Sequence, residues 1–382
     1  MVSFILPGNS ATGGYEVDNS LRFNSGDSPY LSKSIATVSD TKKFTFSTWF
    51  KRSKIPNSNI NLFGADGGST RLSQLFLYEG NDQHIRLYDS LSSTVNIDLT
   101  TDMVFRDISA WYNVVVQVDS TQSTQTDRVK MYINGSQVTF NASATAHTYP
   151  GENASFNFQN ASSTSMYVGS SQTSAGAQYG YYDGYMAETV YLDGQSVDQN
   201  SFGEFDEDSP TIWKPINVSG LTFGTNGFYL NFEDSSSLGN DAAGSNNFTA
   251  NNLAATDQST DTCTNNYAVL NPLSAPSGGF PVLSEGNLQM DDARSGGNDC
   301  TAHSTIAIPH TGKWYYEIKV LDSDYSFLGL SSDNTSGTKR LTYYGNNGNK
   351  FTDSSNASYG ASYTDNDIIS VAVDIANNSV TF

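Results

Sequence analysis

Hydrophobic and polar residues alternate with a period of two over much of the first two hundred positions, most clearly at residues 43–52. Phe44, Phe46 and Phe50 fall on one face of this segment, and Trp49 falls on the other. Aromatic and β-branched residues at alternating positions favour a strand. Large aromatic side chains on both faces predict that both faces are covered, so we expect a central strand of a sheet.

Further segments of the same kind follow at short intervals, separated by turn residues. The strongest turn signal is Asn134-Gly135, because both positions of a two-residue hairpin turn adopt positive φ. Alternating patterns recur at residues 111–118, 128–133 and 185–192. About ten to twelve strands at this spacing predict an all-β fold, an antiparallel β-sandwich or jelly roll.

The chain of 382 residues is too long for one ordinary core, and its pattern changes along its length. We expect an N-terminal arm at 1–19, a sandwich at 20–205, an extended Asn-, Asp- and Ser-rich linker at 206–276, and a second β-sandwich at 277–382. The arm is expected to dock on a neighbour or to be disordered. The last residues are typical of the start of a strand, so the second sandwich is expected to be incomplete and the polypeptide to continue beyond Phe382.

The charge and hydropathy of the chain argue against two classes of binding partner, nucleic acids and membranes. The formal net charge of −20 and a pI near 4.3 argue against binding to nucleic-acid phosphates or anionic membranes. No apolar run reaches membrane-spanning length, so we expect no membrane insertion, and the first residues lack the basic, apolar pattern of a signal peptide. The acidic residues either solvate the surface or bind Ca²⁺ in carboxylate-rich loops.

A search for catalytic patterns leads us to expect that the chain is not an enzyme. The nearest approach to the carboxylate pair of a glycoside hydrolase is Glu-Phe-Asp-Glu-Asp at residues 204–208, which lacks a second Glu at the required spacing. We interpret it as a solvated acidic turn, because Ser-Pro follows it. The four histidines and two cysteines show no metal-ligand spacing, and whether Cys263 and Cys300 pair is open.

The best binding candidates are aromatic residues in a Gly-rich loop at 178–185. Tyr179, Tyr181 and Tyr182 lie there with Asp183. Tyrosine rings stack on the C–H faces of sugars and their hydroxyls bind the rims, so these four residues are candidates for glycan binding. The alternative is that the tyrosines pack into the sandwich or a subunit interface.

The order of the strand-like segments in residues 20–205 resembles the laminin-G-like, concanavalin-A-like lectin sandwich. The resemblance rests on residues 21–23, 44–51, 111–116, 129–135 and 184–188. Lectin-like sandwiches often hold one Ca²⁺ at an end of their sheets. The resemblance therefore implies a calcium site at Asp27, in the first turn, and Glu188, on the returning strand, with no other cofactor required.

Residues 277–382 resemble the first part of a SPRY domain, through residues 312–317, 328–330 and 369–374. The joint at 264–273 resembles that of fibre proteins of marine tailed bacteriophages, in which a lectin-like sandwich precedes a SPRY-like one. The opening residues, Phe-Ile-Leu-Pro-Gly-Asn-Ser, also resemble theirs.

This resemblance implies a virion structural protein, a tail or capsid fibre or adhesin on the virion surface. It further implies a homo-oligomer, with a trimer favoured, that contacts other virion proteins and host-surface polysaccharide or protein. Three alternatives stay open at this point. They are an architectural virion spacer without a ligand, a secreted carbohydrate-binding lectin, and a polysaccharide depolymerase.

Overall fold

The computed structural model describes residues 14–35, 37, 39–56, 58–67, 71–78, 83–144, 147–159, 164–173, 176–273, 281–291, 301–323, 326–331, 340–352 and 355–382. Their regular secondary structure consists of strands and 3₁₀ helices of three residues. Within these ranges no helix has the length and hydropathy needed to cross a membrane. The described residues form two compact units: one contains those up to Asn266 with Ser284–Gly286, and the other contains those of Tyr267–Leu283 and Asn287–Phe382.

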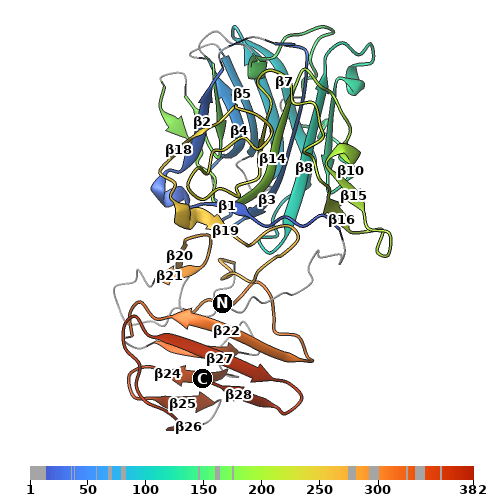
Figure 1. The fold of residues 1–382 in the computed structure, drawn as a ribbon. Coiled ribbons are helices and arrows are strands. Elements are labelled where there is room, and N and C mark those ends of the chain that lie inside the picture. The colour runs from blue at the N-terminus through green and yellow to red at the C-terminus, as the bar shows by residue number, and fades with distance from the viewer. Residues whose placement is uncertain are drawn as a thin grey trace. The chain divides into compact units, whose positions relative to one another are not determined.

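The first unit is a sandwich of two antiparallel sheets (Figure 1). One sheet has the order β10 (Ser136–Gln137), β9 (Val129–Ile133), β8 (Trp111–Asp119), β3 (Lys43–Arg52), β14 (Gly184–Asp193), β1 (Ser20–Phe23) and β19 (Gln258–Ser259), with β17 (Phe228–Leu230) also paired to β14. The other has the order β18 (Thr249–Asn251), β2 (Tyr30–Ser34), β11 (Ser165–Val168), β4 (Ile60–Asp66), β5 (Arg71–Leu77), β6 (His84–Leu91) and β7 (Thr94–Val104). The predicted antiparallel β-sandwich is confirmed.

The predicted central strand is β3, which pairs with β8 on one side and β14 on the other. All of its residues except Lys43 are buried. Phe44, Phe46 and Phe50 point into the core between the sheets, where Phe46 stacks on Phe63 of the opposite sheet at 4.6 Å between ring centroids. The alternation of large apolar side chains thus places this strand at the centre of the sandwich.

The outer face of the eight-stranded sheet is also covered. Trp49 and Trp111 contribute to a second apolar cluster with Val17, Trp213 and Cys263, against which Tyr15 packs. The covering residues come from the N-terminal arm and from the segment after residue 200. Of the predicted arm, residues 1–13 lie outside the described residues, as does Cys300, whereas Cys263 is buried and free.

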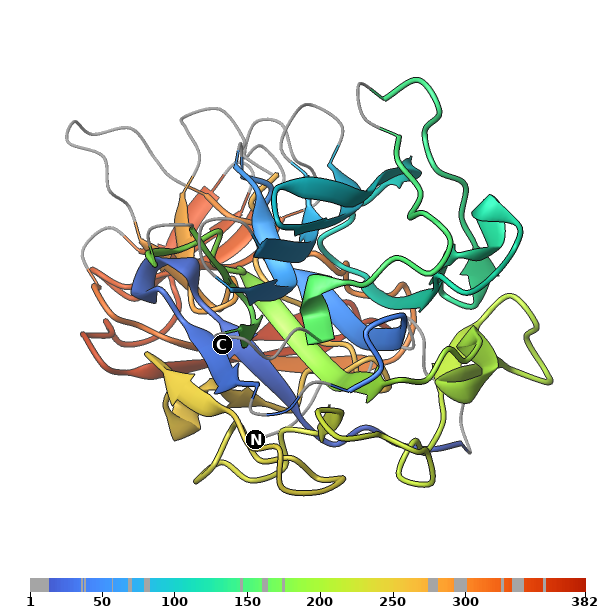
Figure 2. The same cartoon turned by 90° about the horizontal axis from the view of Figure 1, so that it is seen from above.

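The prediction of an extended linker at 206–276 is wrong for residues 206–266. Within this segment β17 pairs with β14, β18 pairs with β2, and β19 pairs with β1. Phe228, Phe232 and Phe248 are buried in the same core as the earlier strands. In Figure 2 the yellow segment around β18 lies beside the blue strand β2. The apolar run at residues 227–232, which contains β17, is typical of a strand, whereas β18 and β19 are only two or three residues long and show no local periodicity.

Three small two-stranded sheets complete the topology outside these layers. They are β12 (Ser171–Gln172) with β13 (Gln178–Tyr179), β15 (Gly203–Phe205) with β16 (Trp213–Pro215), and β20 (Val282–Ser284) with β21 (Gln289–Asp291).

The second unit contains two further antiparallel sheets. One has the order β22 (Lys313–Lys319), β27 (Ile368–Asp374) and β28 (Ser379–Thr381), and the other has the order β23 (Phe327–Ser331), β24 (Arg340–Tyr344), β25 (Asn349–Thr352) and β26 (Ser355–Ser358). Its core is small and centres on Val320, Tyr343 and Tyr363. The fold class, a β-sandwich followed by a second β domain, is as predicted.

Candidate functional site

A shallow polar groove lies on the outer face of the seven-stranded sheet, at its β18–β2–β11 end. Its volume is about 460 Å³, and its lining residues are Tyr30, Ser32, Lys33, Ser34, Ser165, Tyr167, Gln172, Gln178, Asn247 and Thr249. Alternate residues of a strand share a face, so Tyr30, Ser32 and Ser34 lie side by side along β2. The register sets Tyr167 of β11 opposite Ser32, and Thr249 of β18 on the other side of Ser32.

Tyrosine rings line one part of this groove. Tyr30 contacts Tyr167 at 6.2 Å between centroids with an interplanar angle of 60°, and contacts Tyr181 at 6.3 Å with an angle of 37°. Burial raises the pKa of Tyr167 above its usual value. Tyr167 is 5% exposed, so Tyr30 is the tyrosine whose ring is accessible from the groove.

Side-chain amides form a polar rim. The Gln172 amide nitrogen donates to the Gly176 carbonyl at 2.9 Å, and the Gln178 side-chain carbonyl accepts from the Ser170 hydroxyl at 3.1 Å. The Asn247 side-chain carbonyl accepts from the Asp241 backbone N–H at 2.9 Å. Because each amide carries both donor and acceptor atoms, these contacts hold its orientation while the rest of the group faces the groove.

Charge is nearly absent from the lining. Lys33 is the single charged residue, and no Asp or Glu contributes. Burial lowers the pKa of Lys33, while Asp241 and Asp193 act in the opposite direction. A groove of ring faces, hydroxyls and amides suits a neutral polar ligand better than an ion.

None of the four predicted glycan-binding residues is among those that line this groove, although Tyr181 contacts one that does. Tyr181 packs on Tyr30, and the Tyr179 hydroxyl accepts a hydrogen bond from the Gln74 amide of β5. Tyr182 is 0% exposed; its hydroxyl donates to the Lys51 carbonyl at 2.8 Å. Asp183 is buried, and its carboxylate accepts from the backbone N–H and the hydroxyl of Ser25. The prediction was wrong for Tyr182 and Asp183, because their side chains lie inside the sandwich.

The predicted calcium ligands Asp27 and Glu188 lie in unlike surroundings. Asp27 is exposed, and its carboxylate accepts from the Asn24 amide at 2.7 Å. Glu188 is 5% exposed, and the Tyr229 hydroxyl lies 2.9 and 2.8 Å from its two oxygens. Burial raises the pKa of Glu188 to about 7, and its carboxyl group is a hydrogen-bond acceptor for Tyr229. The calcium site at Asp27 and Glu188 stays a prediction. Across the described ranges, no three His, Cys, Asp or Glu gather closely enough to hold a metal ion.

The sequence analysis did not identify most of the residues that line the groove. Tyr30 and Tyr167 belong to strands far apart in the chain, and only the pairing of β2 with β11 brings them together. One local signal was present: Tyr30-Leu31-Ser32-Lys33-Ser34 alternates, with an aromatic ring and two hydroxyls on the polar face. That pattern is typical of a strand with one face toward solvent. The aromatic residue on the polar face, Tyr30, was the local sign of a binding surface.

Comparisons with known families agree with this architecture. The Laminin_G_3 family, the concanavalin A-like lectin/glucanases superfamily, matches residues 24–189, and the SPRY domain family matches residues 313–382. The chain thus carries a concanavalin A-like sandwich followed by a SPRY domain match. No curated protein matches the chain.

Several solved structures share part of the fold. A putative carbohydrate binding protein from Bacteroides ovatus ATCC 8483 is 13% identical with a TM-score of 0.43, covering 62% of this chain and 59% of that one. A heptameric SAP-like pentraxin from Limulus polyphemus is 14% identical with a TM-score of 0.34, covering 47% of this chain and 78% of that one. The enzymatically active domain of tailspike protein 2 of Bacteriophage CBA120 is 12% identical with a TM-score of 0.31, covering 55% of this chain and 34% of that one. At these identities and TM-scores the likenesses carry no argument about ligand or activity.

Proposed function

We propose that the first unit is a lectin-like module that binds neutral glycans in the groove beside β2 and β11. The observation that carries this proposal is the half-buried Tyr30 ring, which packs on the buried Tyr167 and is surrounded by hydroxyls and amides without a lining carboxylate. Ring faces stack on sugar C–H groups, and the rim supplies both donors and acceptors for sugar hydroxyls. A volume of about 460 Å³ lies within the usual range for small-ligand sites.

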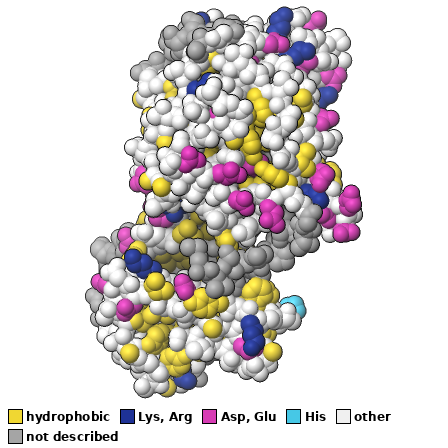
Figure 3. All heavy atoms as spheres, viewed as in Figure 1, with side chains coloured by type: hydrophobic (Ala, Val, Ile, Leu, Met, Phe, Trp, Pro, Cys, Tyr) yellow, Lys and Arg dark blue, Asp and Glu magenta, His cyan; other side chains and the backbone are white. Residues whose placement is uncertain are grey.

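The groove is shallow, so a single site is expected to bind weakly and several copies to raise the avidity. We therefore place the module in an oligomeric virion structural protein, a phage tail or capsid fibre that contacts other virion proteins and host-surface polysaccharide. Support comes from the order of a concanavalin A-like domain before a SPRY domain match, which resembles such fibres. The high net negative charge suits an exposed, soluble surface, and Figure 3 shows Asp and Glu scattered over the face in view.

Binding without catalysis is the favoured activity. The acidic run at 204–208 enters the turn between β15 and β16, where the Asp206 carboxylate accepts from the backbone N–H groups of Asp208 and Ser209 at 3.1 and 2.8 Å. Lys214 lies 3.3 Å from Glu204 and 3.5 Å from Asp206. Carboxylates engaged in a turn and in ion pairs support a structural role over that of a depolymerase.

Glycan binding is tested with the full chain on an array of neutral and acidic polysaccharides, followed by titration calorimetry on the best ligand. Tyr30→Ala removes a stacking ring and should weaken binding about 2- to 10-fold, which corresponds to an aromatic contact of about 0.5–1.5 kcal/mol. Tyr78→Ala is the matched control, because Tyr78 is an exposed tyrosine outside the groove lining. Equal affinity of Tyr30→Ala and wild-type protein would refute the groove as the binding site.

The virion assignment has its own test. An antibody raised against residues 20–205 is applied to intact phage particles and viewed by electron microscopy. Label on fibres or spikes is the expected result. Purified particles without label, with the protein found only free or on cells, would refute the virion assignment and leave the glycan proposal standing as that of a secreted lectin.

A further inference from the structure

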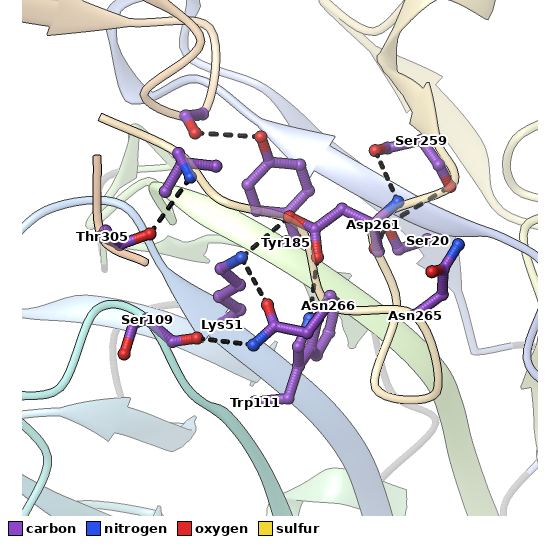
Figure 4. A network of polar contacts seen from close by, with 12 residues as sticks. Ser20, Lys51, Ser109, Trp111, Tyr185, Ser259, Asp261, Asn265, Asn266 and Thr305 are labelled. Carbon is purple, nitrogen blue, oxygen red and sulfur yellow. Dashed lines mark hydrogen bonds and ion pairs between the residues drawn. The ribbon is translucent and has the colours of Figure 1, made fainter. Parts of the chain in front are cut away.

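A lysine is completely buried beside a carboxylate and an amide from a distant part of the chain (Figure 4). Lys51 of β3 has a side chain that is 0% exposed. Its ammonium nitrogen lies 2.8 Å from an Asp261 carboxylate oxygen and 2.7 Å from the Asn266 side-chain oxygen. Fully buried lysines are rare, because removing the charge from water is costly unless partners compensate for it.

The amide of Asn266 is held in one orientation. Its nitrogen donates to the Ser109 carbonyl at 2.8 Å, while its oxygen accepts from Lys51. The Ser109 carbonyl accepts only, so it selects the amide nitrogen and leaves the carbonyl group of the amide facing the lysine. The carbonyl carbon, Cγ, is bonded to the oxygen that Lys51 already contacts.

The carboxylate of Asp261 is fixed in the same way. One of its oxygens accepts from the Trp111 indole N–H at 3.0 Å, and the other contacts the Lys51 nitrogen. The Ser20 hydroxyl donates to the Asp261 backbone carbonyl at 2.6 Å and anchors the segment. A carboxylate in this position is an acceptor for a proton leaving the amine.

The surroundings favour the neutral amine. Trp111 and Tyr185 beside the amine are both buried, so little water solvates a charge there, although the Tyr185 ring, 5.9 Å from the Lys51 nitrogen, attracts a cation. Burial lowers the pKa of Lys51, an effect that Asp261 opposes. An unprotonated amine is a nucleophile, and the burial of Lys51 keeps bulk water away from its nitrogen.

We propose that Lys51 and Asn266 join in a spontaneous intramolecular isopeptide bond, with Asp261 as the proton carrier. The Lys51 nitrogen attacks Cγ of Asn266, and a new C–N bond forms while Asp261 takes the proton that the amine loses. The bond between Cγ and the amide nitrogen then breaks, and that nitrogen takes the proton and leaves as ammonia. An amine and a primary amide give a secondary amide and ammonia, so the step needs no oxidant, cofactor or second substrate.

The bond would close a loop between positions 215 apart in the sequence. It would tie the central strand β3 to Asn266, the last residue of the main segment of the first unit. A cross-link over so long a loop restricts the unfolded chain strongly, and it would keep the unit closed under pulling forces. This inference does not depend on the proposed glycan site.

The test is the mass of the full chain, measured by denaturing mass spectrometry after purification and again after prolonged incubation. The expected result is a loss of about 17 Da, the mass of the ammonia released. A digest should contain a branched peptide that joins residues 44–52 to a segment containing Asn266. A wild-type protein that keeps its full sequence mass after incubation overturns the proposal, whatever the variants do.

Variants distinguish isopeptide formation from other reactions that release ammonia and give the same loss of mass. Lys51→Arg keeps a cation and removes the nucleophile, so its mass should equal the full sequence mass; a loss of about 17 Da in this variant would indicate a succinimide and overturn the proposal. Asp261→Asn should form the bond more slowly or not at all. Lys43→Arg is the matched control, because Lys43 faces the Asp119 carboxylate at 3.4 Å, and it should keep the mass loss.

Discussion

Truncation of Phe228 tests whether residues 206–266 contribute to the core of the sandwich. Phe228 is 0% exposed and lies on β17, which extends the eight-stranded sheet. Its ring lies 4.7 Å from that of Phe248, 5.8 Å from that of Tyr191 and 6.0 Å from that of Phe63. Phe228→Ala therefore removes a large side chain from a site that is filled from three other strands or loops.

The expected loss of stability follows from this packing. A buried Phe→Ala substitution costs about 3–5 kcal/mol, because transfer free energy is lost and a cavity remains. For a unit of this size, each kcal/mol shifts the melting temperature by about 2–4 °C, so a fall of roughly 6–20 °C is expected. Differential scanning calorimetry of the full chain measures it, with the two units observed as separate transitions if they unfold independently.

Phe205→Ala provides the matched control. Phe205 is 41% exposed, and its ring contacts that of Trp213 edge-on at 5.0 Å. This substitution should cost at most about 1.5 kcal/mol, the size of one aromatic pair. If Phe228→Ala left the transition of the first unit unchanged, residues 206–266 would not contribute to its stability and the reasoning from burial would fail.

Two further predictions concern a turn glycine and a buried acid. Gly135→Ala should destabilise the first unit by at least about 2 kcal/mol, because Gly135 has φ of 75° and a Cβ there would lie 2.2 Å from the Trp213 ring. Gly151→Ala, which meets no atom within 4 Å, should be neutral in the same urea titration; equal effects would refute this explanation. Glu188 has a pKa raised from 4.5 to about 7 by burial, so the folded state binds more protons than the unfolded state between these pH values and wild-type stability falls as the pH rises through them. The stability of Glu188→Gln relative to wild type should therefore rise by about 3 kcal/mol between pH 4 and pH 8. Asp89, a second buried carboxyl whose pKa burial raises to about 6, is present in both proteins and cancels in the difference. A flat difference would contradict the assignment.

The sequence predicted those strands whose own residues show a clear alternation of apolar and polar side chains. Residues 43–52 alternate over a whole strand and carry aromatic side chains on both faces, so both the strand and its central place followed from the pattern. The turn at Asn134-Gly135 followed from its need for positive φ, which the structure has at both positions. The alternation of side chains along a strand and the residue types in a turn are local properties. Both can be recognised without knowing which strands pair.

The rest depends on contacts between distant segments. β18 and β19 are too short to show a period, and their identity as strands comes from pairing with β2 and β1. The groove also depends on contacts between distant segments. The tyrosines of the loop at 178–185 gave a stronger local indication of a binding site than Tyr30 or Tyr167, which lie on separate strands. Whether a tyrosine such as Tyr182 faces the core or solvent is set by the strand that follows it, which composition does not reveal.

The place of β1 has a consequence for how the chain is made. Leu21 pairs with Met186 of β14 on one side and with Gln258 of β19 on the other. Ser20 pairs with Ser259 in the same ladder, 239 positions later, so this edge of the sheet closes only after that length of chain has been made, which at about 5–20 residues per second takes roughly 10–50 s on the ribosome. During that interval the nascent chain holds an open sheet edge and an uncovered aromatic face. We expect expression of this protein to depend on chaperone capacity more than on the stability of the finished fold.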